Sequence, residues 1–284
     1  MSALEAPRQR DHMSKREISL NSLLLTLLKH RSLIRQLVAR EFVQRYRGSL
    51  LGLVWAILTP LITVAMFTFL FGVVFPTRWT TGPTTTQDFA IVFLCGLMVH
   101  AIFAEAISRA PSLITGNSSY VKRVIFPLEI LPFVTVASAT INAGIGLAIV
   151  VIAQLLHNHE LHLTLLWLPV VIIPYLLLVS GLVIFTSALG VYLRDIQQFV
   201  ALIVTATLFM TPIFYPIEAV PAAFRPLLYW SPLTFIVENV RRIILFGNTP
   251  DFIGLCIYSV IAVIVLWGGF IWFQKTRSGF ADVI

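Results

Sequence analysis

The sequence predicts an all-α integral membrane protein with six transmembrane helices, an N-terminal amphipathic interface helix, and short re-entrant outer helices between spans five and six. Its composition is the first reason, because 58% of the 284 residues are hydrophobic and only 12% are charged. A soluble domain carries roughly 25% charged residues. The second reason is that several uncharged stretches exceed the ~20 residues that a helix needs to cross hydrocarbon. These stretches are 48–77, 130–156, 161–193 and 252–274.

The distribution of Lys and Arg predicts the orientation. Ten of the 20 basic residues precede the first span, and six more fall in the other segments expected inside. By the positive-inside rule, both termini are therefore expected in the cytoplasm. Residues 1–17 are polar and lack the apolar stretch of a secretory signal, so we expect a flexible N-terminal extension there.

Residues 18–47 are expected to form the interface helix. Apolar residues recur there at steps of three and four, with basic residues largely between them. This pattern is typical of a helix that lies in the membrane interface, its cations facing anionic head groups. A soluble helix packed on a partner is the alternative. Arg40, Arg45 and Arg47 crowd its end, directly before the first apolar run.

The spans carry few polar features. Pro60 lies within the first span and predicts a kink. Glu105 stands four residues before Arg109 at the inner end of the second span, which is the spacing of a helical ion pair. A carboxylate in a membrane often marks function, but at this depth a plain interfacial salt bridge fits equally well. The six predicted spans are about 51–75, 89–107, 126–156, 163–193, 197–215 and 252–274.

Two connections have an unusual composition. The first part of residues 110–132 is too polar to remain in lipid. We therefore expect a short cytoplasmic helix at about 111–120, after which the chain enters the membrane again beyond Lys122 and Arg123. Residues 211–247 are apolar yet carry five prolines between 212 and 232. They are expected to form two short helices that dip back from the outer face, where protein or a watery cavity satisfies the backbone.

Enzymatic chemistry is not expected. The sequence has no P-loop, no H-E-x-x-H and no G-x-S-x-G motif. Three histidines, His157, His159 and His162, could suggest a metal site, but no carboxylate or thiol supports it and a solvated loop is favoured. Acids are scarce within the spans, which argues against a proton relay. We expect no metal and no cofactor on this chain, and an energy source elsewhere.

Four motifs follow one another along the chain: RYRGSLLGLVWAILTPL, NSSYVKRVIFPLEILP, VYLRDIQQFVALIVTATLFMTPIFYPIEAVP and WSPLTFIVENVRRIILFG. Together with the amphipathic helix, they resemble the transmembrane subunit of ABC-2 type polysaccharide exporters, the O-antigen, teichoic acid and capsule group. The resemblance covers about residues 30–284. It implies a subunit of an ATP-driven exporter that moves a lipid-linked polysaccharide, O-antigen-like and anchored on undecaprenyl diphosphate, across the bacterial inner membrane.

The resemblance also implies the partners. Two copies of this chain would pair with two copies of a separate ATPase, and that ATPase would bind the ATP and Mg. The chain would also contact membrane lipids. No nucleic acid is expected as a partner. Capsule, teichoic acid or a drug as cargo remain alternatives, as does a membrane scaffold that transports nothing. Two positions depart from the family pattern: Leu128 stands where a basic residue is often seen, and Ser231 where Asn is often seen. The first departure weakens any claim about charge at that inner turn.

Site residues are implied in the same way. The end of the interface helix resembles the cytosolic gate, where a lipid diphosphate would meet cations that bind phosphate bidentately. For each arginine, a role in topology alone is the alternative. Residues 212–246 resemble the outer gate helices. The head-group residues are Arg40, Arg45, Tyr46 and Arg47, and the residues that couple to the ATPase are Pro111, Leu113, Ile114, Asn117, Ser118 and Tyr120.

Aromatic residues are plentiful, with 21 Phe, 7 Tyr and 6 Trp. Most are expected to pack between helices or to anchor at the interfaces. A passage for sugars would also use ring faces, because the apolar face of a pyranose stacks on them. The candidates by depth for such a translocation path are Trp55, Phe67, Phe71, Phe103, Phe209 and Tyr215.

Overall fold

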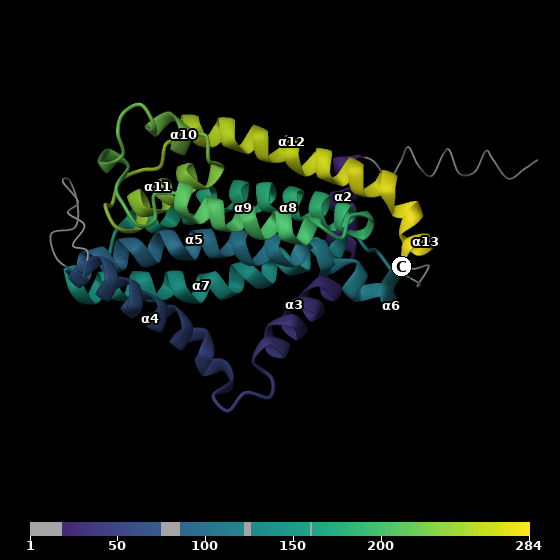
Figure 1. Ribbon diagram of the computed structural model, residues 1–284, viewed down its shortest axis with the longest axis horizontal. Helices are drawn as coiled ribbons and strands as arrows, with labels where there is room; N and C mark the ends of the chain where they lie inside the picture. The colour runs from purple at the N-terminus through teal and green to yellow at the C-terminus, as the bar shows by residue number, and fades with distance from the viewer. Residues whose placement is uncertain (1–18, 75–85, 122–125, 160) are drawn as a thin grey trace, which may run out of the picture.

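The computed structural model describes residues 19–74, 86–121, 126–159 and 161–284, and its regular structure within these ranges is entirely helical. Four helices are long and apolar enough to cross a membrane, which confirms four of the predicted spans by length and composition. They lie side by side along the long axis of the molecule (Figure 1). These helices are α5 (Thr86–Leu113), α7 (Ile130–Asn158), α8 (Leu168–Tyr192) and α12 (Phe252–Thr276).

The other two predicted spans form shorter helices. The first follows a 3₁₀ turn, η1 (Gly52–Val54), as α4 (Trp55–Thr68), with Pro60 inside it, and continues as the π-helix η2 (Phe69–Val74). The fifth is α9 (Ile196–Met210), whose 15 residues extend about 22 Å at 1.5 Å per residue. This is shorter than a hydrocarbon core of about 30 Å. The count of six spans therefore stays a prediction.

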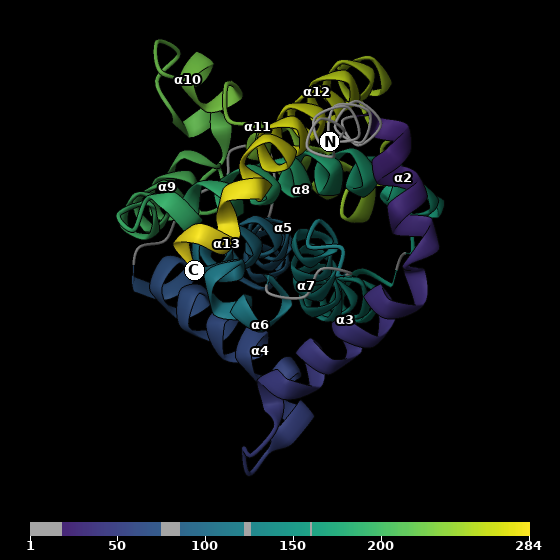
Figure 2. The same cartoon turned by 90° about the vertical axis from the view of Figure 1, so that its right-hand side faces the viewer.

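The interface segment consists of two helices instead of the single helix predicted over 18–47. Helices α2 (Leu20–Lys29) and α3 (Arg31–Tyr46) meet at His30, and Ser19 caps the first of them. Figure 2 shows α2 and α3 along the flank of the bundle, with α3 beside α7. Only Leu23 and Val38 of these helices are buried, so each helix contacts the bundle along a narrow stripe.

The turn that joins α3 to α4 stands away from the bundle (Figure 1). Gly48 and Gly52 adopt φ values of +86° and +51° there, a left-handed conformation that glycine adopts without a Cβ clash. The apolar residues of the turn face outward, and Leu50 is fully exposed. We call residues 48–54 the apex.

Helix α5 forms the centre of the bundle and packs against α7, α8, α9 and α11 (Pro232–Ile244). Beside it, α8 and α12 approach each other closely at two glycines. A Cβ added to Gly269 would lie 2.4 Å from the carbonyl oxygen of Gly181, a distance that real Cβ atoms do not reach. Small residues at such a crossing let helix backbones come into contact in membranes.

The short helix predicted at 111–120 begins later than expected. Helix α5 continues through Pro111 to Leu113, and only then follow the 3₁₀ turn η3 (Thr115–Asn117) and the short helix α6 (Ser118–Val121). The Asn117 side chain donates a hydrogen bond of 2.8 Å to the Leu113 carbonyl and closes the junction.

The proline-rich segment contains η5 (Ile217–Ala219), α10 (Arg225–Tyr229) and α11. That these helices re-enter the membrane from outside stays a prediction. The side chain of Arg241 in α11 is only 1% exposed. Its guanidinium donates hydrogen bonds to the carbonyls of Val92, Pro212 and Ile213 and pairs with Glu238 at 2.9 Å. It therefore joins α5 and the turn after α9 to α11.

Candidate functional site

The end of α3 meets α5 and the middle of α7, and four polar side chains form one network there. Arg45 of α3 donates from both terminal nitrogens to the two carboxylate oxygens of Glu105 on α5, one bond measuring 2.8 Å. Asn142 of α7 donates to the same carboxylate at 3.1 Å, and the Tyr46 hydroxyl donates to the Asn142 side-chain oxygen at 2.8 Å. The end of the interface segment is thus bound to two helices of the bundle.

Arg109 extends the network. It pairs with Glu41 of α3 and lies 3.8 Å from Glu105. The ion pair that the sequence predicts between Glu105 and Arg109 is therefore confirmed, but Glu105 is bound more directly by Arg45. The hydrogen bonds that Arg45 donates to Glu105 raise the pKa of Arg45 above its ordinary value.

A cavity of about 360 Å³ adjoins this network. Arg45, Tyr46 and Asn142 supply polar groups to it, and most of the rest of its lining is apolar. Such a lining suits an amphiphile with an anionic head group, because pockets combine apolar walls with a few polar groups that orient the ligand. The remaining lining residues are Trp55, Ala56, Thr59, Pro60, Thr63, Met98, Ala101 and Ala143.

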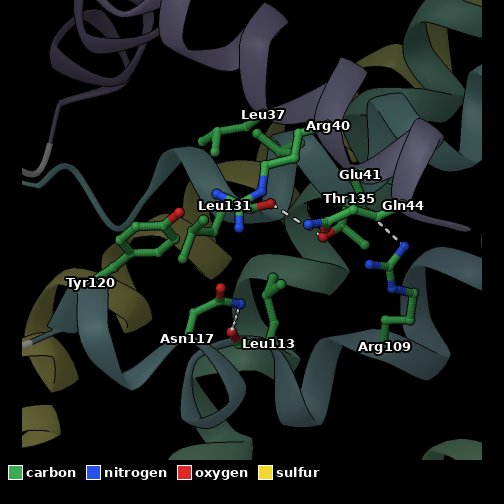
Figure 3. Close-up of a pocket in the computed structure, with 11 residues that line it drawn as sticks. Leu37, Arg40, Glu41, Gln44, Arg109, Leu113, Asn117, Tyr120, Leu131 and Thr135 are labelled. Atoms are coloured by element: carbon green, nitrogen blue, oxygen red, sulfur yellow. Dashed lines mark hydrogen bonds and ion pairs between the residues drawn. The ribbon is translucent and has the colours of Figure 1, made fainter. Parts of the chain in front are cut away.

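A second, smaller cavity of about 160 Å³ lies on another face of α3 (Figure 3). Figure 3 shows Arg40 and Gln44 on one side of it, with Asn117 and Tyr120 across from them. Within the described part of the chain, Arg40 makes no ion pair. This cavity therefore lies between the interface helix and the segment expected to couple to an ATPase.

The structure consequently separates the four predicted head-group residues. Arg45 and Tyr46 line the larger cavity, and Arg40 lines the smaller one. Arg47 is exposed at the C-cap of α3 and makes no ion pair among the residues described.

Three of the predicted path aromatics gather in one cluster. The Phe67 ring lies 4.9 Å from that of Phe93 and 5.3 Å from that of Phe214. Phe209 lies 5.8 Å from Phe214, and the Tyr215 hydroxyl donates to the Phe209 carbonyl at 2.6 Å. The cluster joins α4, α5, α9 and the turn that follows α9.

The other three path candidates lie elsewhere. Trp55 is 39% exposed and lines the larger cavity. Phe103 is only 6% exposed and packs in the core, so its ring has little free surface to offer a sugar. The side chain of Phe71 lies outside the described residues.

Burial also divides the predicted coupling residues. Pro111, Leu113 and Ile114 are buried in the bundle. Asn117, Ser118 and Tyr120 are half-buried. The exposed residues of this segment are Ser112, Thr115, Gly116 and Ser119, none of which the sequence singled out.

Sequence reasoning also missed Glu41 and Asn142. Asn142 carried a usable signal, because an amide within an otherwise apolar span needs a hydrogen-bonding partner. Glu41 carried none, since its partner Arg109 is distant in the sequence.

The apolar bundle and its charged interface segment define a multi-pass helical membrane protein. The chain belongs to the ABC-2 type transporter family, whose sequence model matches residues 32–245. This confirms the resemblance read from the four motifs.

Several curated proteins are similar to most of the chain. The O-antigen export system permease protein RfbA of Myxococcus xanthus is 26% identical over 260 residues, 91% of this chain and 97% of that protein. The RfbA protein of Klebsiella pneumoniae is 22% identical, over 86% of this chain and 92% of its own length. The polysialic acid transport protein KpsM of Escherichia coli is 22% identical, over 83% of this chain and 90% of its own length.

Proposed function

We propose that this chain is the transmembrane subunit of an ATP-driven exporter that carries a lipid-linked, O-antigen-like polysaccharide across the bacterial inner membrane. Two copies of the chain would form the passage, and two copies of a separate ATPase would supply energy. Membership of the ABC-2 family and the names of the similar permeases support this proposal. Capsule export is the second candidate, because the similar KpsM protein is named for polysialic acid transport.

The larger cavity is the observation that carries the proposal. A lipid diphosphate needs cations for its head and an apolar wall for the first part of its chain. Arg45 offers the cation, and Trp55, Pro60 and Met98 offer the apolar wall. Guanidinium groups bind phosphate through two parallel hydrogen bonds, which suits Arg45 to this role.

Replacing both Arg45 and Arg47 by Gln tests the head-group role. We expect export to fall about tenfold or more, since a hydrogen bond to a charged group contributes about 1.5–3 kcal/mol. Surface polysaccharide is measured on intact cells that lack the chromosomal copy, and the amount of protein in the membrane is measured in parallel.

The matched control is Arg31→Gln with Arg35→Gln. It removes the same charge from exposed positions of the same helix. Export should stay near normal in this control. Normal export by the Arg45 and Arg47 variant, at a normal membrane level, would refute the head-group role.

Ser119→Glu tests the coupling segment. Ser119 is exposed, so the substitution leaves the bundle intact but would place an unpaired charge in a contact with the ATPase. We expect polysaccharide exported per ATP hydrolysed to fall about tenfold. The measurement uses purified complexes in proteoliposomes.

Thr249→Glu is the control for this experiment. Thr249 is exposed and lies just before α12 begins at Phe252. This control should leave the amount of polysaccharide exported per ATP hydrolysed unchanged. A normal ratio for Ser119→Glu would place the ATPase contact outside this segment.

A further inference from the structure

Arg45 is not a free cation. Glu105 binds its guanidinium through both carboxylate oxygens, and Asn142 holds that carboxylate from the other side. The Arg45 side chain is still 26% exposed and lines the larger cavity, so a ligand there can reach it. Glu105 does not line the cavity and acts on such a ligand through Arg45. An anionic head group that binds the same two terminal nitrogens of Arg45 must therefore displace Glu105.

The surrounding membrane makes this competition important. Its cytoplasmic leaflet presents a high density of anionic lipids. Most carry a single phosphodiester charge, and an unpaired arginine beside the bilayer would attract them. Glu105 carries the same single charge and is already in place with a two-bond geometry. A singly charged head group therefore gains little by displacing it.

A diphosphate is different, because it carries at least two negative charges. Coulomb attraction to Arg45 grows in proportion to that charge. We propose that Glu105, acting through Arg45, determines the specificity of the larger cavity: it withholds Arg45 from singly charged lipid head groups and releases it to a lipid-linked diphosphate. This inference rests on the proposed function, since it assumes a lipid-linked diphosphate as ligand.

The neighbouring residues make the exchange reversible. A displaced carboxylate that lost every partner would pay a large desolvation penalty. Arg109 lies 3.8 Å from Glu105 on the same helix and can take over as its counter-ion. Asn142 can keep its bond to the carboxylate. Glu105 thus has a second partner when Arg45 turns to the ligand.

Glu105→Gln tests the inference in the full chain, purified together with its ATPase. The measurement is the dissociation constant of two probes, farnesyl diphosphate and short-chain phosphatidylglycerol. In the unaltered protein, farnesyl diphosphate should bind more tightly by a wide margin. In Glu105→Gln, phosphatidylglycerol should bind about tenfold more tightly, while farnesyl diphosphate gains less. The ratio of the two constants should therefore fall.

Inorganic pyrophosphate separates a lipid-linked ligand from a free one. It should bind at least about tenfold more weakly than farnesyl diphosphate, because it cannot use the apolar wall. Equal binding would show a site for free diphosphate and would overturn the lipid-linked assignment.

Glu129→Gln is the matched control. Glu129 forms another ion pair between segments, with Arg277 at 3.0 Å, and this arginine, unlike Arg45, does not line the cavity. The probe ratio should not change in this variant. Glu105→Asp, which keeps the charge on a shorter side chain, should give an intermediate ratio and serves if Glu105→Gln fails to fold.

An unchanged ratio of the two dissociation constants in a folded Glu105 variant would overturn the inference. The ion pair would then only stabilise the fold. Failure of the proposed function would look different: the purified protein would discriminate between the probes, yet cells would export no polysaccharide.

Discussion

Replacing Arg241 with Met is expected to lower the free energy of unfolding by about 3–5 kcal/mol, because it removes several hydrogen bonds from a buried charged donor, each of which contributes about 1.5–3 kcal/mol. The guanidinium is the donor for three carbonyls, those of Val92, Pro212 and Ile213. Met fills a similar volume but donates nothing, so these oxygens lose their partners within an apolar bundle. Thermal unfolding in detergent, followed by tryptophan fluorescence, measures the effect.

Arg242→Met is the control, because it removes the same charge from the next position of the same helix. Arg242 is exposed, and we expect its loss to change stability little. Equal unfolding temperatures for the two variants would show that the Arg241 hydrogen bonds do not stabilise the fold.

Replacing Gly269 with Ala is expected to destabilise the protein by about 1–3 kcal/mol, as overpacking does. The new Cβ would meet the Gly181 carbonyl oxygen at 2.4 Å, so α8 and α12 would have to separate. The backbone of Gly181 cannot move aside as a flexible side chain would. The unfolding temperature in detergent is again the measurement.

The adjacent Gly268 provides a control of opposite sign. A Cβ added there meets no atom within 4 Å. Alanine is favoured over glycine in a helix by roughly 0.5–1 kcal/mol, so Gly268→Ala should be neutral or slightly stabilising. Similar destabilisation of both variants would mean that the close contact between α8 and α12 does not limit stability.

The sequence predicted the long helices well because an apolar run of 20 or more residues is a strong local signal. It predicted span five less well. Helix α9 ends at Met210, before Thr211 and Pro212, and the residue before a proline disfavours the helical conformation. The interface segment breaks at His30, a residue with no strong breaking signal of its own.

The candidate site could be predicted only where its contacts are local. The pairing of Glu105 with Arg109 follows from their helical spacing. The pairing of Arg45 with Glu105 joins positions 60 residues apart, so no periodicity reveals it. The burial of Arg241 could not be predicted for a related reason, because arginine is rarely buried and only the assembled carbonyls around it explain its burial.

The apex determines how this protein must be handled outside its membrane. Leu50, Leu51, Leu53 and Val54 stand exposed on a turn that projects from the bundle (Figure 1). A detergent micelle that covers only the bundle would leave these side chains exposed to water, and exposed apolar patches promote aggregation. A reconstituted lipid disc wide enough to enclose the apex should therefore yield a more uniform preparation than a small micelle.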